Sequence, residues 1–330
     1  MKTFNLKYGL IGFILIFNFS CGNSKKTSDN KIADNKVEKK HIFIPSFNAD
    51  SAYHFVAEQL SFGPRTPGSE AHQNCLNFLE KTLKRFTPDV QIQTFKTRLF
   101  SGEIIEGNNI IASFQPEKKN RILLCAHWDS RPFADQDDDP ANHDKPLQGA
   151  NDGASGVGVL LEIARHLNTH KTAPGIDIIF FDLEDSGTYG NNDSWALGSQ
   201  YWSKNPHQIN YRARFGILLD MVGGTDPVFT KEETSMSYAP GIMDKVWKTA
   251  TRLGYSDYFR PTRTGAILDD HVPINQNLNI PTIDIIHYDD KNSTGFFKHW
   301  HTLGDDLSAI DPISLKVVGH TVMTVIFEEK

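Results

Sequence analysis

The sequence predicts an α/β fold, a three-layer α/β/α sandwich around a twisted sheet that is mixed but mostly parallel. Two observations predict it. Short, very apolar runs alternate along the chain with stretches of helical periodicity that are long enough to cross back over a sheet. Strands joined in this way pair in parallel, and helices then cover both faces of the sheet. Once the N-terminus is set aside, roughly 280 residues remain, which fits one large domain over residues 43–330.

The expected elements follow from these periodicities in chain order. Helical periodicity is found over residues 50–60, 70–86, 154–168, 195–203, 240–253 and 312–328. Apolar, strand-like runs are found over residues 103–114, 121–126, 176–182, 215–221 and 281–286. In a largely parallel sheet the ligand site lies beyond the carboxyl ends of the strands, so the residues that follow each strand are the first candidates for chemistry.

The first twenty residues are expected to be a lipoprotein signal peptide rather than a part of the fold. Lys2 and Lys7 form a short, positively charged region before an apolar run, Gly9–Phe19. This run is too short to span a membrane as a helix, which needs ~20 residues. It ends in NFSC, which resembles a bacterial lipobox, although Asn18 stands where leucine is usual.

Residues 21–42 are expected to form a disordered tether that starts at a lipidated Cys21, because they are polar and charged and have little apolar surface to bury. A chain anchored in this way would lie in the bacterial cell envelope and face the periplasm. The alternatives are a plain signal peptide that is cut nearby and an unusual N-terminal anchor.

Composition limits the possible partners. The formal net charge is −6, which argues against a nucleic-acid partner, because binding phosphate normally needs a basic face. No Lys/Arg-rich block lies outside the tether, so a polybasic membrane patch is not expected, and a monomer is the working expectation. Cys75 and Cys125 fall in apolar patterns typical of small core residues, and a disulfide between them is left open.

Five polar segments carry the candidate chemistry. They are ILLCAHWDS, LQGANDGASGVGVLLEIARHL, IIFFDLEDSG, GILLDMVGG and KHWHTLGDD. The candidate residues in them are His127, Asp129, Asp152, Asp182, Glu184, Asp185, Asp220, His299 and His301. A carboxylate directly after a buried strand lies close to a low-dielectric interior, where an unpaired anion is costly. A divalent cation would neutralise several of them at once, and mixed histidine and carboxylate ligands favour zinc.

Each residue taken alone has a simpler interpretation. Asp152 directly precedes a helix and is a candidate N-cap. His127 alone is typical of a satisfied polar residue at a strand end, and Asp185 and Asp220 alone are typical of surface ion pairs. The five segments together are much harder to explain in this way, so we predict a metal site.

In their order along the chain, the motifs HxDS, GANDGASG, FFDxE followed by an acid, LLDM and WHT resemble the co-catalytic zinc aminopeptidase superfamily. That superfamily also contains the glutaminyl cyclases, and the similarity spans about residues 50–328. The resemblance implies a zinc-aminopeptidase-like fold. A two-metal aminopeptidase would use His127, Asp152 and Asp220 on one zinc, and Asp152, Asp185 and His301 on the other.

Three features favour the cyclase branch. The segment AILDDHVPINQNLNIP resembles a cyclase pattern whose first acid, Asp269, belongs to a hydrogen-bond network with Asp220; the alternative is a turn with a cap. Trp300 precedes His301, as does a tryptophan that walls the glutamine pocket in cyclases; the alternative is a core aromatic residue. The loop HWDSRPFADQDDDPANHDKPLQGANDG also closely resembles that of bacterial cyclases.

For the metal, the cyclase resemblance implies a single catalytic zinc held by Asp152, Asp185 and His301, with the fourth position open. His127 is a ligand only in the two-zinc alternative. Asp185 stands where many relatives have glutamate, and the shorter side chain remains a normal zinc ligand.

The resemblance also implies roles for the other candidates. Glu184 would move the proton from the attacking amine to the departing nitrogen, while Asp220 and Asp269 would orient these groups. Trp300 would shape the substrate pocket, and His271 is a weaker candidate for a substrate contact.

The implied activity converts the N-terminal glutamine of peptides and proteins to pyroglutamate with release of ammonia; the alternative is a dizinc aminopeptidase. A binding module on an inactive peptidase fold would show loss of Glu184 or of a ligand, and none is lost. The acidic stretch Asp135–Lys145 lies between two motifs, which suggests a rim over the pocket, and no motif assigns it a role.

Overall fold

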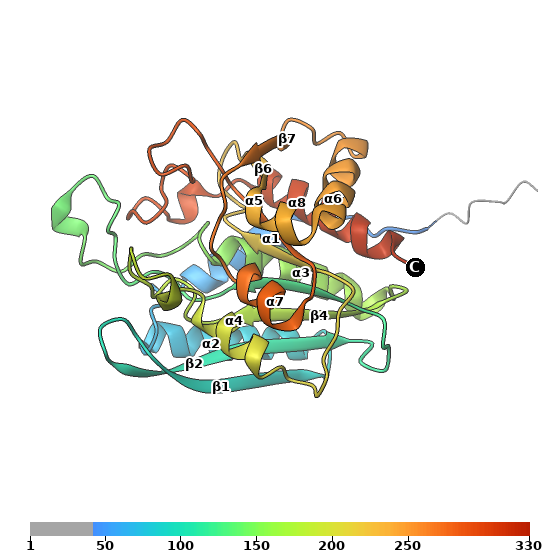
Figure 1. The fold of residues 1–330 in the computed structure, drawn as a ribbon, viewed down its shortest axis with the longest axis horizontal. Coiled ribbons are helices and arrows are strands. Elements are labelled where there is room, and N and C mark those ends of the chain that lie inside the picture. Colours follow the sequence, from blue (N-terminus) through green and yellow to red (C-terminus); the bar gives the residue numbers. More distant parts are fainter. Residues whose placement is uncertain (1–41) are drawn as a thin grey trace, which may run out of the picture. The chain divides into compact units, whose positions relative to one another are not determined.

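A six-stranded sheet forms the centre of the computed structural model, which describes residues 42–330 (Figure 1). The spatial order of the strands is β1–β2–β4–β3–β5–β8. Their bounds are β1 Val90–Arg98, β2 Ile104–Phe114, β3 Arg121–His127, β4 Gly175–Phe181, β5 Gly216–Asp220 and β8 Thr282–Ile286. Pairs β4/β3, β3/β5 and β5/β8 are parallel, whereas β2 is antiparallel to both β1 and β4. The expected mixed, mostly parallel sheet is therefore confirmed.

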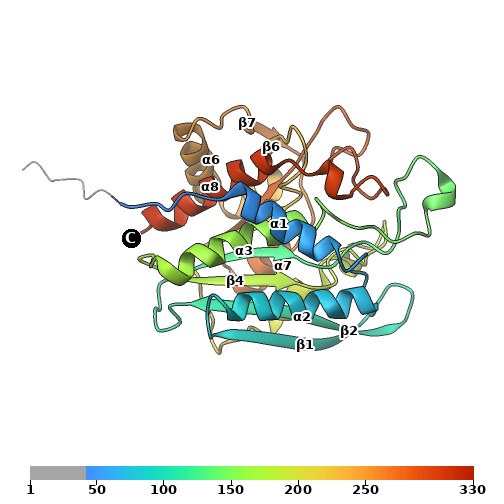
Figure 2. The same ribbon diagram turned by 180° about the vertical axis from the view of Figure 1, so that it is seen from behind.

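Helices cover both faces of this sheet. One face carries α1, α2, α3, α6 and α8, which are best seen in Figure 2, and the other carries α4 and α7, which lie in front in Figure 1. The bounds are α1 Ala49–Leu60, α2 Glu70–Lys84, α3 Ala154–Thr169, α4 Leu197–Lys204, α6 Pro240–Arg252, α7 His271–Leu278 and α8 Pro312–Glu328. A separate apolar core lies on each face of the sheet. Because side chains alternate along a strand, Leu124 packs under the helices of the first face, while its neighbours Leu123 and Cys125 pack against α4 and α7 on the other.

Several elements were not expected from the sequence. Strand β1 is an edge strand in which Phe95 alone is buried, so it lacks a continuous apolar run. Helix α7 has only eight residues and a weak apolar periodicity. A small parallel pair, β6 (Phe229–Glu232) and β7 (Phe259–Thr264), and the short helix α5 (Glu233–Tyr238) also lie outside the predicted set.

The close packing of α3 against the sheet places the loop that precedes this helix. A Cβ atom on Gly156 would lie 2.3 Å from the carbonyl oxygen of Leu219 in β5, so only glycine permits this approach. The first turn of α3 is thereby pressed against the carboxyl end of the sheet.

Some expectations about the chain have a simple outcome. Cys75 and Cys125 are both buried free thiols, so they are not joined to each other. Within residues 42–330, no helix combines the length and the apolar character needed to cross a membrane. The proposed signal peptide, the lipidated Cys21 and nearly all of the tether lie outside the described residues.

Candidate metal centre

Three parallel strands deliver ionisable side chains to the same edge of the sheet. Strand β3 ends at His127, β5 ends at Asp220, and β4 is followed directly by residues 182–185. Asp152 arrives in the loop before α3. Since β3, β4 and β5 run in the same direction, their carboxyl ends meet, and the predicted residues are brought together.

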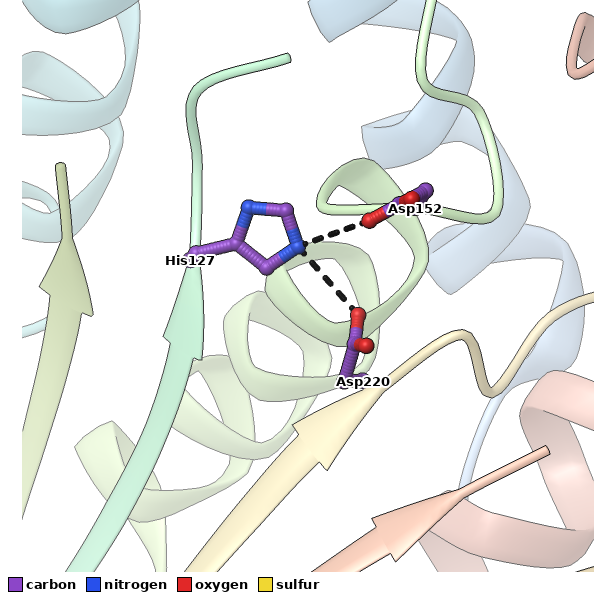
Figure 3. A group of neighbouring side chains, drawn as sticks. All are labelled: His127, Asp152 and Asp220. Atoms are coloured by element: carbon purple, nitrogen blue, oxygen red, sulfur yellow. Dashed lines mark hydrogen bonds and ion pairs between the residues drawn. The ribbon is translucent and has the colours of Figure 1, made fainter. Parts of the chain in front are cut away.

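One ring nitrogen of His127 faces two of the aspartates (Figure 3). Its Nε2 atom is 3.0 Å from Asp152 Oδ1 and 3.2 Å from Asp220 Oδ1. On the other side of the ring, Nδ1 is 3.4 Å from Asp129 Oδ1. Burial alone would lower the pKa of His127, but its close contacts with these three aspartates raise that pKa well above its usual value.

A second group, Asp152, Asp185 and His301, shares Asp152 with the first. His301 Nε2 is 3.2 Å from Asp185 Oδ1 and 3.6 Å from Asp152 Oδ2. Asp152 Oδ2 and Asp185 Oδ2 are buried and have no hydrogen-bond partner within the described residues. Unpartnered buried carboxylate oxygens beside an imidazole fit a divalent cation, which would satisfy both oxygens at once. Both predicted ligand sets are therefore assembled.

Asp152 does not cap α3; a hydrogen bond from its backbone N–H holds it in place. The N-cap position of α3 is Gly153, and no side chain caps the helix, so the N-cap interpretation of Asp152 is wrong. The buried carboxylate of Asp305 accepts hydrogen bonds from the backbone N–H of Asn151 at 2.8 Å and of Asp152 at 3.0 Å. Gly153 has φ +97°, and a Cβ there would meet the carbonyl oxygen of Asp129 at 2.6 Å.

The turn that carries Glu184 and Asp185 is held by another carboxylate. Asp129, which is fully buried, accepts hydrogen bonds from the backbone N–H of Glu184 at 3.1 Å and of Asp185 at 3.2 Å. Leu183 just before them adopts φ +59°, a conformation that a leucine rarely takes. Asp182 in turn pairs with His72 at 2.8 Å.

A cavity of about 260 Å³ opens beside these groups. This is below the ~300–1,000 Å³ of sites for drug-sized ligands, so it suits a small group such as one side chain. Carboxylates from both candidate groups line it together with apolar walls. The lining residues are Asp152, Glu184, Asp185, Tyr189, Gly190, Asn192, Trp195, Asp220, Met221, Ala266, Ile267, Leu268, Asp269, Ile286, Phe296, Trp300 and His301.

The aromatic wall is larger than expected from the sequence. Trp300 lies in the lining, and its ring stacks on that of His301 with a centroid distance of 3.8 Å. Trp195, Tyr189 and Phe296 were not singled out, and all three also line the cavity. Trp195 lies near parallel to His301 at 6.3 Å. The sequence offered one signal for Tyr189 and Trp195 as cavity residues: both are aromatic and come shortly after the acidic motif FFDLED.

Three acids that line the cavity have raised pKa values. Burial, followed by repulsion from Asp269, raises the pKa of Glu184 well above its usual value. Burial and repulsion from Asp152 raise the pKa of Asp220 to about 7. Burial also raises the pKa of Asp269. These groups therefore readily hold protons, and a cation nearby would shift each balance toward the ionised form.

His271 does not line the cavity. It is fully buried at the start of α7, and its Nε2 lies 3.5 Å from Glu232 Oε1. The arrangement offers no direct substrate contact for His271. Asp270 at the N-cap position makes no side-chain hydrogen bond to α7, so the capping alternative for this pair of acids is not seen either.

Comparison with solved structures identifies similar chains. The crystal structure of Bacteroides thetaiotaomicron glutaminyl cyclase bound to N-acetylhistamine is 50% identical, with a TM-score of 0.86, and the match covers 87% of this chain and 100% of that one. A Zn-dependent exopeptidase from Parabacteroides distasonis gives the same identity, TM-score and coverage.

A curated relative and a family model complete the comparison. The glutaminyl-peptide cyclotransferase of Drosophila melanogaster is 25% identical over 277 residues, which cover 75% of this chain and 72% of the relative. The model of peptidase family M28 matches residues 109–326, well over half of the sequence. The chain therefore belongs to peptidase family M28.

Proposed function

We propose that the chain is a zinc-dependent glutaminyl-peptide cyclotransferase, which closes the N-terminal glutamine of peptides and proteins into pyroglutamate and releases ammonia. One observation carries the proposal: tryptophan rings, the acids Glu184 and Asp269, and the candidate ligands all line the same small cavity. The 50% identity to a bacterial glutaminyl cyclase over all of that chain supports it.

Asp152, Asp185 and His301 would hold one zinc ion. Three protein ligands with an open fourth position are typical of catalytic zinc. The unpartnered Oδ2 atoms of both aspartates fit this assignment. When bound, zinc supplies Lewis-acid polarisation of the amide carbonyl of the substrate.

The protein's own residues would handle the proton and the conformation of the substrate. The α-amine of the substrate attacks its own side-chain amide carbon; the new N–C bond forms and the amide C–N bond breaks. Glu184, which lines the cavity next to the ligand Asp185, takes a proton from the attacking amine and delivers it to the departing nitrogen, which leaves as ammonia. Asp220 and Asp269 line the same cavity and would orient these nitrogens.

The protein would also accelerate the reaction by holding the glutamine side chain of the substrate folded toward its own α-amine. An intramolecular attack in a preorganised geometry can be worth ~7–11 kcal/mol in ideal cases. The rings of Trp195 and Trp300 narrow the cavity and exclude water, which would otherwise compete with the amine as the nucleophile.

A dizinc aminopeptidase is the second candidate, since His127, Asp152 and Asp220 form a further group that shares Asp152. The same Glu184 would then activate a water molecule. The name of the similar exopeptidase from Parabacteroides distasonis agrees with this alternative.

The first prediction separates the two activities. With a peptide that begins with glutamine, the full chain should release ammonia without shortening the peptide, which mass spectrometry would detect as a loss of ammonia. A peptide that begins with leucine is the control and should remain intact. Release of free leucine, together with a zinc content near two per chain, would favour the aminopeptidase.

The second prediction separates proton transfer from metal binding. Glu184→Gln should lower the turnover by at least ~100-fold, because removal of a general acid or base typically costs 10²–10⁴-fold, while zinc stays bound. His301→Ala should release the zinc, as measured by elemental analysis after dialysis. Normal turnover in Glu184→Gln would rule out the assigned proton shuttle.

The third prediction concerns Asp284, a fully buried residue in β8 that groups with Asp269 and His271. Burial and repulsion from Asp269 raise its pKa well above the usual value. Asp284 therefore stays protonated in the folded chain while it ionises in the unfolded chain above about pH 4, so it makes folding less favourable as the pH rises.

Asp284→Asn should remove this effect. The free energy of unfolding of the variant, relative to the parent, should rise with pH above about pH 4, by up to ~1.4 kcal/mol per pH unit. Urea unfolding of the zinc-loaded chain measures it, with Asp257→Asn at an exposed site as the matched control. A difference between variant and parent that does not change with pH would contradict the assignment.

The location of the enzyme is a part of the proposal that rests on the sequence. We infer a monomer that is lipidated at Cys21 and lies in the bacterial cell envelope, facing the periplasm. Labelling of cells with a radioactive fatty acid should mark the parent chain and leave Cys21→Ser unlabelled. Equal labelling of both would contradict the anchor.

A further inference from the structure

The acidic loop between β3 and α3 holds the segment that carries His301. The backbone N–H of Gln136 donates to the carbonyl oxygen of His301 at 3.1 Å, and Asp137 Oδ2 accepts from the backbone N–H of Leu303 at 3.0 Å. His301 has φ +55°, a left-handed conformation that is unfavourable for a histidine and needs support from its neighbours. The loop therefore supplies one contact at this residue and one two residues after it.

Asp135 lies behind the imidazole ring of His301. Nδ1 of the ring is 3.4 Å from Asp135 Oδ1, whereas Nε2 faces Asp185 and Asp152. A histidine that offers Nε2 to a cation keeps its proton on Nδ1, and a carboxylate beside Nδ1 fixes both this tautomer and the orientation of the ring.

Arg131 fixes Asp135 and also reaches the second candidate ligand. Its Nε is 2.9 Å from Asp135 Oδ1 and its Nη2 is 2.5 Å from Asp135 Oδ2, which is a bidentate pair. Its Nη1 donates to the carbonyl oxygen of Asp185 at 3.0 Å and lies 3.3 Å from Asp185 Oδ1. The guanidinium is buried, 4.8 Å from the ring of Trp195. Arg131 therefore contacts one candidate ligand, Asp185, directly and reaches the other, His301, through Asp135.

We propose that Asp135, held by Arg131, is a positioning residue for His301, and that the loop Arg131–Lys145 sets the affinity of the site for zinc. The inference rests on the proposed function, because it takes Asp185 and His301 as zinc ligands. No residue of Asp135–Lys145 lines the cavity, so the expected rim over the pocket is not formed. The loop acts on the site from behind, through His301 and Asp185.

The test compares zinc dissociation constants of the full chain, measured by competition with a chromophoric chelator. Loss of a residue that supports a metal ligand typically weakens metal affinity by 10–100-fold. Asp135→Asn, which keeps an acceptor oxygen, should weaken zinc binding by about 10-fold, and Asp135→Ala by up to about 100-fold. Asp138→Asn is the matched control, since this exposed residue of the same loop has no side-chain hydrogen bond or ion pair among residues 42–330. It should keep the parent value.

Two further measurements separate positioning from other roles. The hydroxyl of Tyr189 lies 3.0 Å from the same Nδ1, so Tyr189→Phe is tested beside Asp135→Asn. A weaker zinc affinity in Tyr189→Phe with a parent affinity in Asp135→Asn would transfer the role to the hydroxyl and overturn the inference.

Thermal unfolding with and without zinc provides the other measurement. If Asp135 positions the ligand, the stabilisation that zinc gives should shrink in Asp135→Asn, while the zinc-free chain changes little. Equal losses in both states, with an unchanged zinc dissociation constant, would show a merely structural role and overturn the inference. A parent chain that takes up no zinc would instead contradict the proposed function, before any variant is compared.

Discussion

Crowded negative charge is the constraint on which the site depends. Five carboxyl groups line one small cavity, and His301 is the one basic side chain in that lining: the acids are Asp152, Glu184, Asp185, Asp220 and Asp269. Buried charges of one sign repel each other and lose the solvation of water, so the folded chain must either bind a cation or hold protons. The cavity does both at different places. Asp152 and Asp185 each have a buried oxygen without a partner that could bind a cation, whereas the pKa of Glu184 is raised, so this carboxyl group can hold a proton.

The sheet explains why so many acids converge. Strands β3, β4 and β5 are buried on both faces and run in the same direction, so the polar residues at their carboxyl ends lie at the same edge. Helix α3 packs so closely on β5 that the loop before it is pushed into the same place. The apolar packing that stabilises the fold therefore also offsets the unfavourable free energy of placing several carboxyl groups together at this edge.

Long periodic elements and the motifs next to them could be predicted from the sequence. His127, Asp152 and Asp220 each lie at the end or the start of such an element, and the structure brings them together. Strand β1 and helix α7 could not be predicted in this way, because one is a half-exposed edge and the other is short. The placement of His271, which points to Glu232 rather than to the cavity, follows from α7 and was therefore missed as well.

The residues that support the site were missed for a different reason. Asp305 binds the backbone of Asp152 across 153 positions of the sequence, and Tyr189 reaches His301 across 112. No periodicity or local spacing reports such pairs, because they form only when the loops are folded over one another. Arg131 and Asp135 are close in sequence, yet their relation to His301 depends on the same long-range folding.

What an acid does in this site is decided by what its oxygens already accept. Both oxygens of Asp129 are used by the backbone N–H groups of Glu184 and Asp185, and both oxygens of Asp305 are used by the loop of Asp152. Each oxygen of these two acids accepts a backbone N–H, so both acids serve as structural clamps. Asp152 and Asp185 each keep one buried oxygen without a partner and can bind a cation. The residue type is the same in all four places, so composition alone does not separate clamp from ligand. The motif resemblance points to Asp152 and Asp185, and the folded chain supplies the physical reason, an oxygen left without a partner.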